Sequence, residues 1–276
     1  MRRRWEGWIG CRPEFSGAPR MSRAERRDSS ALFRLTGLLG FLAIWWIASQ
    51  AATTPNLLPS PLQVAAYAWR ATVTGELPRQ MAYTLARVAA AFVIAMAGGS
   101  AAGYAMGRNR RLNEIADPWL VIGLNVPLLL VIILAYIWIG LNDIAAVLAV
   151  VAAKTPSVVV TLREGARALD PSLDDMAAVF RLPYLRRLRN VVLPQLAPYL
   201  TAAGRSGLSI TWKIVLVVEL LGRPNGVGFV LNSAFQNFDV TAILAYGLAF
   251  AAIMLVIETC ALQPLEKRAR VWRADA

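Results

Sequence analysis

Apolar segments long enough to cross a membrane alternate with short polar connections along most of the chain. A helix needs about 20 apolar residues to cross a hydrocarbon core of about 30 Å. Six segments meet this condition, at residues 31–50, 83–107, 116–140, 144–162, 196–221 and 240–262. The pattern therefore predicts an all-α, polytopic membrane protein with six transmembrane helices. Only Gly-Leu-Asn-Asp (140–143) separates the third and fourth segments, which predicts a tight helical hairpin.

The composition agrees with this class and excludes several kinds of site. Hydrophobic residues make up 57% of the 276 residues and charged residues 17%, so the chain is more apolar than an ordinary soluble domain. It has no histidine, the commonest general base and metal ligand. Its two cysteines, Cys11 and Cys260, lie near the chain ends, so neither a disulfide framework nor a zinc site is predicted. No glycine loop ending in Gly-Lys-Ser/Thr is present, so no P-loop for ATP is predicted.

The net charge of +12 is concentrated in alternate connections. Arginine is abundant at both chain ends and in the connections 108–115 and 163–195. The other connections hold few Lys or Arg residues: two in 51–82, none in 140–143 and one in 222–239. The positive-inside rule then predicts that both termini and the two arginine-rich connections are cytoplasmic. Membrane topology therefore explains the charge without a nucleic-acid partner.

The chain is divided into two parts by composition. Residues 1–30 form a basic tail, which we expect to be cytoplasmic and disordered, and residues 31–276 form one transmembrane domain. The tail lacks an apolar stretch followed by a small-residue cleavage site, so it is not a normal signal peptide. The sequence is also coherent from Met21, which leaves open whether translation starts there or at Met1.

The connection 163–195 contains the longest basic stretch between two apolar segments, DDMAAVFRLPYLRRLRNVVLP (174–194). Asp170 and Pro171 predict a helix start, and Pro183 ends this helix because it disfavours helical backbone at the preceding residue. A basic helix follows, and Pro194 marks the entry to the next span. The residues leave two interpretations open: a solvated connector held by anionic lipid, or a rigid docking element for a cytoplasmic protein.

This loop resembles the signature loop of importer-type ABC transporter permeases, which reads Glu-Ala-Ala, three residues, Gly, nine residues, Ile, any residue, Leu-Pro. The chain has the same spacing, with Asp175, Met176 and Ala177, then Arg181, then Val191, Val192, Leu193 and Pro194. Asp175 and Met176 replace the motif's Glu and first Ala. Arg181 replaces its Gly, and a left-handed turn at a residue other than glycine is costly.

Other pieces resemble the nitrate/sulfonate/taurine subfamily of these permeases. They are LPSPLQVAAYAW (58–69), TLARVAAAF (84–92), LREGARALDP (162–171) and VVELLGRPNGVGF (217–229), and the resemblance extends from about residue 57 to 270. It implies a MetI-like permease architecture with a cytoplasmic coupling helix, a bacterial inner-membrane location and a homodimer. It also implies a periplasmic or lipoprotein binding protein that delivers a small solute, such as nitrate, a sulfonate or taurine.

In such importers the ATPase subunits bind ATP, so the resemblance implies a chain that has no cofactor and is not an enzyme. The residues that it implies for ATPase docking are Asp174, Asp175, Met176, Ala177, Ala178, Arg181, Leu182, Pro183, Leu193 and Pro194. The rival hypotheses are an ATP-independent secondary transporter or channel, which would use coupling carboxylates near the midplane, and a membrane enzyme.

Charged and helix-breaking residues inside the predicted spans need a reason, because a charge there costs about 2.5–3.5 kcal/mol. Candidates for a translocation path are Asn125, Pro127, Arg205, Lys213 and Glu219. Lys213 and Glu219 are six positions apart, so they do not share a helix face, and we expect partners from other helices or a second subunit. The alternative is helix packing or interface anchoring. Arg87 and Lys154 are further charges inside the predicted spans.

Overall fold

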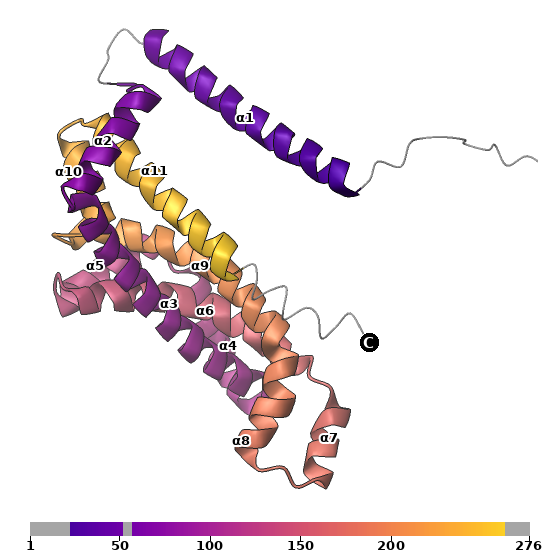
Figure 1. Ribbon diagram of the computed structural model, residues 1–276. Helices are drawn as coiled ribbons and strands as arrows, with labels where there is room; N and C mark the ends of the chain where they lie inside the picture. The colour runs from indigo at the N-terminus through magenta and orange to yellow at the C-terminus, as the bar shows by residue number, and fades with distance from the viewer. Residues whose placement is uncertain (1–22, 52–56, 263–276) are drawn as a thin grey trace, which may run out of the picture. The chain divides into compact units, whose positions relative to one another are not determined.

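The computed structural model describes residues 23–51 and 57–262, which form helices and no strand (Figure 1). The chain separates into two compact units, Met1–Ala51 and Ala52–Ala276. In the first unit the described residues form one helix, α1 (Arg23–Ala51), which contains the first predicted span. Residues 1–22 of the predicted tail, including Cys11 and Met21, lie outside the described residues.

The second unit is a bundle of helices around a central group of three. Its elements are α2 (Pro61–Val73), α3 (Glu76–Arg108), α4 (Arg110–Asn125), α5 (Leu128–Ile139), α6 (Asp143–Arg167), α7 (Pro171–Val179), α8 (Tyr184–Arg187), η1 (Leu188–Val192), α9 (Leu193–Gly222), α10 (Val227–Gln236), α11 (Val240–Ile257) and η2 (Glu258–Leu262). Helices α3, α6 and α9 pack against one another, and α3 packs most extensively against α6. The end formed by α2 and α10 and the end formed by α7 and α8 lie far apart in this unit (Figure 1).

Single helices account for three of the predicted spans. Within the described residues α3, α6 and the helix Val240–Cys260 are long and apolar enough to cross a membrane. Two bent pairs, α4 with α5 and Tyr184–Gly222 with α10, raise the number to five if each pair is one span. The all-helical membrane class is confirmed, and the count of six spans stays a prediction.

The third predicted span is wrong as a single helix. It breaks at Val126–Pro127, where α4 and α5 meet at 99°. Pro127 lacks an N–H and disfavours helical backbone at Val126, whose ψ is 129°. The segment is apolar, as predicted, but Pro127 divides it into two helices instead of lying inside one span.

The predicted hairpin after α5 is confirmed. Gly140 has φ of +93°, a conformation that favours glycine. Asn142 is the N-cap of α6, and its side chain accepts a hydrogen bond from the Ala145 N–H at 2.8 Å. The chain therefore reverses between Ile139 and Asp143.

Small residues set the close approach of α3 and α6. Gly99, Gly103 and Gly107 follow one another at four-residue spacing and form one face of α3. A Cβ added at Gly103 would lie 2.6 Å from the Val159 carbonyl oxygen of α6, and one at Gly99 would lie 2.7 Å from Val158. The two backbones thus approach to a distance that only glycine permits, as is common for helices in lipid.

Candidate functional site: the loop helix and the charged residues of the spans

Helix α7 begins where the sequence predicts. Asp170 is its N-cap and accepts a hydrogen bond from the Ser172 N–H at 2.8 Å, and Pro171 occupies the first turn. The hydrogen bonds from Ser172 lower the pKa of the Asp170 carboxyl. The cap therefore stabilises the folded state most at a pH above the ordinary pKa of a carboxyl group. This stabilisation is lost as the pH falls through the lowered pKa of Asp170.

Helix α7 ends in a Schellman motif with Arg181 in the left-handed position, where its φ is +48°. The Leu182 N–H donates to the Ala177 carbonyl and the Arg181 N–H to the Ala178 carbonyl, both at 3.0 Å. The left-handed turn is therefore made by arginine at the place where the signature motif has glycine. Pro183 follows and caps α8.

The second helix of the loop continues into the membrane. Helices α8 and α9 are joined by a π-helical segment, η1, in which the Leu193 N–H donates to the Leu188 carbonyl. Pro194, which lacks an N–H, lies in the first turn of α9. Pro194 therefore marks the entry to the span, as predicted, without interrupting the helix.

Asp174 ties α7 to the rest of the bundle. Its carboxylate lies 2.5 Å from Nη2 of Arg108, at the end of α3, and 3.0 Å from Nη2 of Arg187 in α8. Its side chain is largely buried by these partners, with 12% exposed. These ion pairs connect α7 to the end of α3 and to α8.

The predicted docking residues fall into two groups. Ala177 is 2% exposed, whereas Ala178 is exposed. Asp174 and Leu182 are partly buried, and the exposed residues are Asp175, Met176, Ala178, Arg181, Pro183, Leu193 and Pro194. Ala177 thus supports the fold of the loop and does not belong to its outer surface.

The outer surface of the loop contains five large apolar residues, of which only Met176 was among the predicted docking residues. We call Met176, Val179, Phe180, Tyr184 and Leu185 the apolar loop face. Phe180 is 71% exposed and Val179 is 79% exposed. The signal in the sequence for the other four is the run of large side chains on either side of Arg181, none of which occupies a position of the signature motif.

A buried polar network joins α3, α9 and the turn before α10. The Glu219 side chain is 0% exposed, and its Oε1 lies 2.6 Å from Nη1 of Arg87. Its Oε2 accepts hydrogen bonds from Thr84 Oγ1 at 2.8 Å and from the Gly228 N–H at 2.9 Å. The expectation that Glu219 would find partners on other helices is confirmed, and these contacts keep it from reaching interfacial water.

Side chains of α3 also satisfy the first N–H groups of α10. Gln80 Oε1 accepts from the Gly226 N–H at 2.7 Å, and Thr84 Oγ1 accepts from the Val227 N–H at 2.8 Å. Together with Glu219 they replace the cap that Gly226 lacks. Gly226 has φ of +105°, and a Cβ there would overlap the Glu219 carboxylate. The glycine-rich sequence GRPNGVG is thus a turn that packs closely against the buried Glu219 carboxylate.

Arg87 extends this network towards the surface. Its Nε donates to Oδ1 of Asp143 at 2.8 Å, and its Nη1 also donates to the Asn225 carbonyl at 3.0 Å. Asp143 pairs in addition with Arg223 at 3.0 Å. Arg87 was predicted only as a costly charge inside a span and not as a site residue, although Thr84 and Arg87 are spaced to share a helix face.

The other predicted path residues do not come together. Lys213 is exposed on α9 with its Nζ 5.5 Å from the centre of the Trp212 ring. Arg205 is half exposed and pairs with Glu258 at 3.7 Å. Asn125 and Pro127 are exposed at the α4–α5 break. Lys154, by contrast, is buried and donates to Ser157 Oγ at 2.8 Å.

Comparisons with known proteins identify relatives along most of the chain. The family model described as "Binding-protein-dependent transport system inner membrane component" matches residues 94–262. The taurine transport system permease protein of Escherichia coli is 26% identical over 242 residues, which cover 85% of this chain and 87% of the relative. The bicarbonate transport system permease protein of Synechococcus elongatus is 28% identical over 239 residues, covering 82% and 85%. A putative aliphatic sulfonates transport permease protein of Bacillus subtilis is 25% identical over 233 residues, covering 84% of each chain.

Proposed function

Since the chain belongs to the family of binding-protein-dependent transport system inner membrane components, we propose that it is the transmembrane subunit of an ATP-driven importer of a small anion. The names of three relatives refer to taurine, bicarbonate and aliphatic sulfonates. Each of these solutes carries an anionic group. The anionic group is therefore the shared feature that this chain would recognise.

The observation that carries the proposal is the apolar loop face, which lies exposed on α7 and α8. Five large apolar side chains lie exposed next to Asp175 and Arg181, on the connection that is the richest in arginine. An exposed apolar patch on a water-facing loop is typical of a protein interface. ATPase subunits that dock there would bind the ATP, so the chain itself would need no cofactor and would do no chemistry.

The attachment of α7 suggests how motion would pass into the spans. Asp174 links α7 to Arg108 of α3 and Arg187 of α8, and α8 continues into α9. A partner that displaces α7 on closing around ATP would therefore pull on two of the three central helices. Rigid helices transmit such a displacement, whereas a flexible connection would absorb it.

The cationic residues of α9 support an anion path between two copies of the chain. Lys213 and Arg205 are both exposed on α9 in a single chain. A lysine facing lipid costs about 2.5–3.5 kcal/mol. A second copy of the chain, or water between two copies, would remove this cost. A path between the two copies would also place the cationic groups of α9 beside the translocated anion.

The distribution of arginine supports a topology for this subunit. Both termini and the loop with α7 would face the cytoplasm of a bacterial cell, and the α2 and α10 end would face the periplasm. A periplasmic or lipoprotein binding protein would deliver the solute to the latter end. Anionic lipid would contact the arginines that flank the spans.

Purification of the tagged protein from its native membranes in mild detergent, with mass spectrometry of its partners, tests this proposal. We expect a P-loop ATPase in near-equal amount with the wild type. Phe180→Asp should lose the ATPase, whereas Phe238→Asp should retain it, because Phe238 is 82% exposed on the turn between α10 and α11. A wild type without an ATPase after cross-linking would overturn the proposal and favour an ATP-independent transporter.

A further inference from the structure

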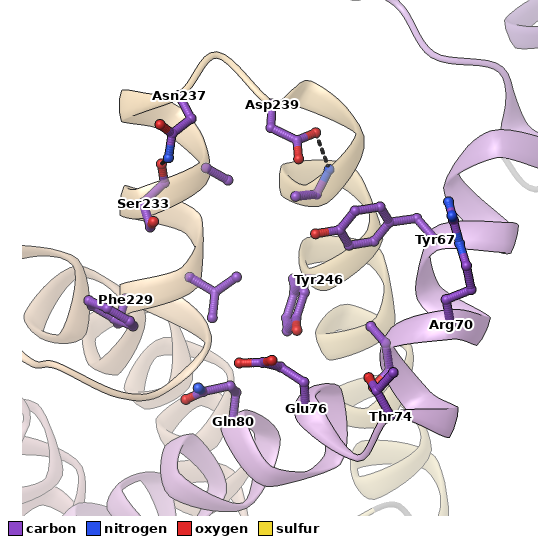
Figure 2. A pocket seen from close by; sticks show the side chains of 14 residues that line it. Tyr67, Arg70, Thr74, Glu76, Gln80, Phe229, Ser233, Asn237, Asp239 and Tyr246 are labelled. Carbon is purple, nitrogen blue, oxygen red and sulfur yellow. Dashed lines mark hydrogen bonds between the residues drawn. The ribbon is translucent and has the colours of Figure 1, made fainter.

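The acids that line the cavity at the α2 and α10 end already have partners. This cavity has a volume of about 570 Å³ and lies between α2, the start of α3, α10 and the start of α11 (Figure 2). Glu76 pairs with Arg79 at 3.3 Å, and Asp239 caps α11 by accepting a hydrogen bond from the Ala242 N–H at 3.0 Å. A charge that lacks a partner lies instead in the interior of the bundle, on α6.

Lys154 is a buried cation without a counter-ion. Its side chain is 4% exposed, and it forms no ion pair with any residue that the structure describes. Arg87 and Glu219 are buried to a similar degree, but they neutralise each other at 2.6 Å. A buried ammonium group is costly unless an anion compensates its charge. The surroundings of Lys154 are therefore suited to an anionic ligand.

The ammonium group of Lys154 uses only one of its three N–H donors. Its Nζ donates to Ser157 Oγ at 2.8 Å, and the Ser157 hydroxyl in turn donates to the Lys154 carbonyl at 3.0 Å. The other two donors have no acceptor among the described residues. Ser157 is partly exposed, so the end of the lysine lies close to the surface of a single chain.

Lys154 lies near the middle of a helix that is long and apolar enough to cross a membrane. It follows Asp143, the first residue of α6, by 11 positions and precedes Arg167, the last residue, by 13. At 1.5 Å per residue it is about 16 Å from one end of α6 and about 20 Å from the other. A charge is most costly at this depth, and a translocated solute must pass it.

Helix α9 leaves room for the lysine and adds a hydroxyl without a partner. A Cβ added at Gly207 would lie 3.2 Å from Cε and 3.8 Å from Nζ of Lys154, so the end of the lysine lies against this glycine. Thr211 follows four residues later on the same face of α9. It is 0% exposed, and its Oγ1 has no hydrogen-bond partner. Buried hydroxyls are normally satisfied, so Thr211 offers a hydrogen bond to a ligand beside Lys154.

We propose that Lys154 binds the anionic group of the translocated solute, with the Thr211 hydroxyl as a further donor. This inference rests on the function proposed above and adds a binding site to it. The ammonium group supplies the opposite charge and two N–H donors, which suit the oxygens of a sulfonate or carboxylate group.

The solute would reach Lys154 when α9 shifts relative to α6. Both helices enclose the ammonium group in this structure, and Gly207 of α9 lies against it. Helix α9 is continuous with α8, which pairs with α7 through Arg187 and Asp174. A displacement of the loop would therefore move the helix that covers Lys154, and it would couple access to this site to the ATPase.

NMR of the full-length protein in detergent tests the site directly, with ¹³C-labelled lysine and methanesulfonate as the probe. The chain has three lysines, Lys154, Lys213 and Lys267, so the Lys154 signal is assigned by its loss in Lys154→Arg. Methanesulfonamide is the neutral control of similar shape. We expect a saturable shift of the Lys154 Cε signal with methanesulfonate alone. An unchanged signal at equilibrium would overturn the proposal, and this measurement depends on neither an ATPase nor uptake.

Two substitutions separate an anion site from a packing role. Lys154→Met should weaken methanesulfonate binding at least tenfold in isothermal titration calorimetry, without lowering the midpoint of thermal denaturation, because it removes a buried charge that lacks a counter-ion. Thr211→Val keeps the size of the side chain and should weaken binding several-fold. Arg110→Met is the control for the change in net charge, since Arg110 is exposed and pairs with Glu114. Unchanged affinity in both Lys154→Met and Thr211→Val would overturn the proposal.

Uptake by the importer reconstituted in proteoliposomes tests whether the site lies on the translocation path. Lys154→Met should abolish uptake of the transported anion, whereas Lys154→Arg keeps the charge and should retain part of it. Normal uptake by a Lys154→Met variant that no longer binds methanesulfonate would overturn the role of Lys154 in translocation. A wild type that binds methanesulfonate but has no ATPase would contradict the proposed function and leave the anion site standing.

Discussion

Arg87 and Glu219 form an ion pair between α3 and α9 in which both side chains are buried, with 2.6 Å between Nη1 and Oε1. The pair lies 132 residues apart in the chain. It holds two central helices together and, through Gly228 and Asn225, fixes the turn that precedes α10. Charges that are costly in a membrane here satisfy each other.

Arg87→Met should destabilise the protein by about 3–5 kcal/mol, because it leaves the Glu219 carboxylate buried without its cation. The measurement is the midpoint of thermal denaturation in detergent. Arg110→Met is the control, since the exposed pair of Arg110 and Glu114 is worth about 0–1 kcal/mol. The double variant Arg87→Met with Glu219→Gln should lose less than the sum of the single variants, and strict additivity would contradict the pairing.

Neighbouring glycines of α3 should respond in opposite directions to alanine. Gly103→Ala places a Cβ 2.6 Å from the Val159 carbonyl oxygen, so it should separate α3 from α6 and cost about 1–3 kcal/mol. Gly98→Ala meets nothing within 4 Å and should be neutral or stabilising by up to about 1 kcal/mol. Thermal denaturation of both variants is the test, and equal midpoints would contradict the predicted role of Gly103.

Much of the fold could be predicted from the sequence because lipid imposes long apolar helices. The cap at Asp170, the turn at Gly140 and the helix end before Pro183 are local features, and each depends on residues within one or two turns. The break at Pro127 could be predicted only as a kink. Its 99° angle depends on how α4 and α5 pack, which no local signal contains.

The sites were harder to predict because they join distant parts of the chain. A single sequence does not show that Arg87 forms an ion pair with Glu219, or that Asp174 forms ion pairs with Arg108 and Arg187. The loop was recognised from its motif positions, but which side of α7 faces outward depends on its docking onto the bundle. For this reason Ala177 was assigned to docking although it is buried.

Arg181→Gly should stabilise the end of α7 by about 0.5–1 kcal/mol. A left-handed conformation costs an L-residue about 1–2 kcal/mol, and glycine avoids this cost. Part of the gain is lost because glycine has greater conformational freedom in the unfolded chain. Hydrogen exchange of residues 170–190, measured by mass spectrometry, should become slower. Arg186→Gly is the control, because Arg186 lies inside α8 and its replacement should make exchange faster.

Ala177→Arg and Ala178→Arg should separate folding from docking. Ala177 is buried, so an arginine there should disorder the loop and lower the yield of folded protein. Ala178 is exposed, so an arginine there should leave denaturation unchanged while weakening the ATPase complex. Size-exclusion chromatography, thermal denaturation and co-purification measure these effects. A stable, well-folded Ala177→Arg variant would contradict the inward orientation of this side chain.

Lys213→Gln should weaken anion uptake if α9 lines the translocation path. The ammonium group is exposed on α9 in a single chain and lies over Trp212, so it is available to an anion between two copies. The measure is the KM for uptake of a labelled sulfonate, taurine or bicarbonate, whichever the reconstituted importer transports, and we expect a rise of several-fold at equal protein level. Lys213→Arg keeps the charge and should retain uptake. If Lys213→Gln transports with an unchanged KM and rate, Lys213 anchors or packs the helix and the anion path follows another face.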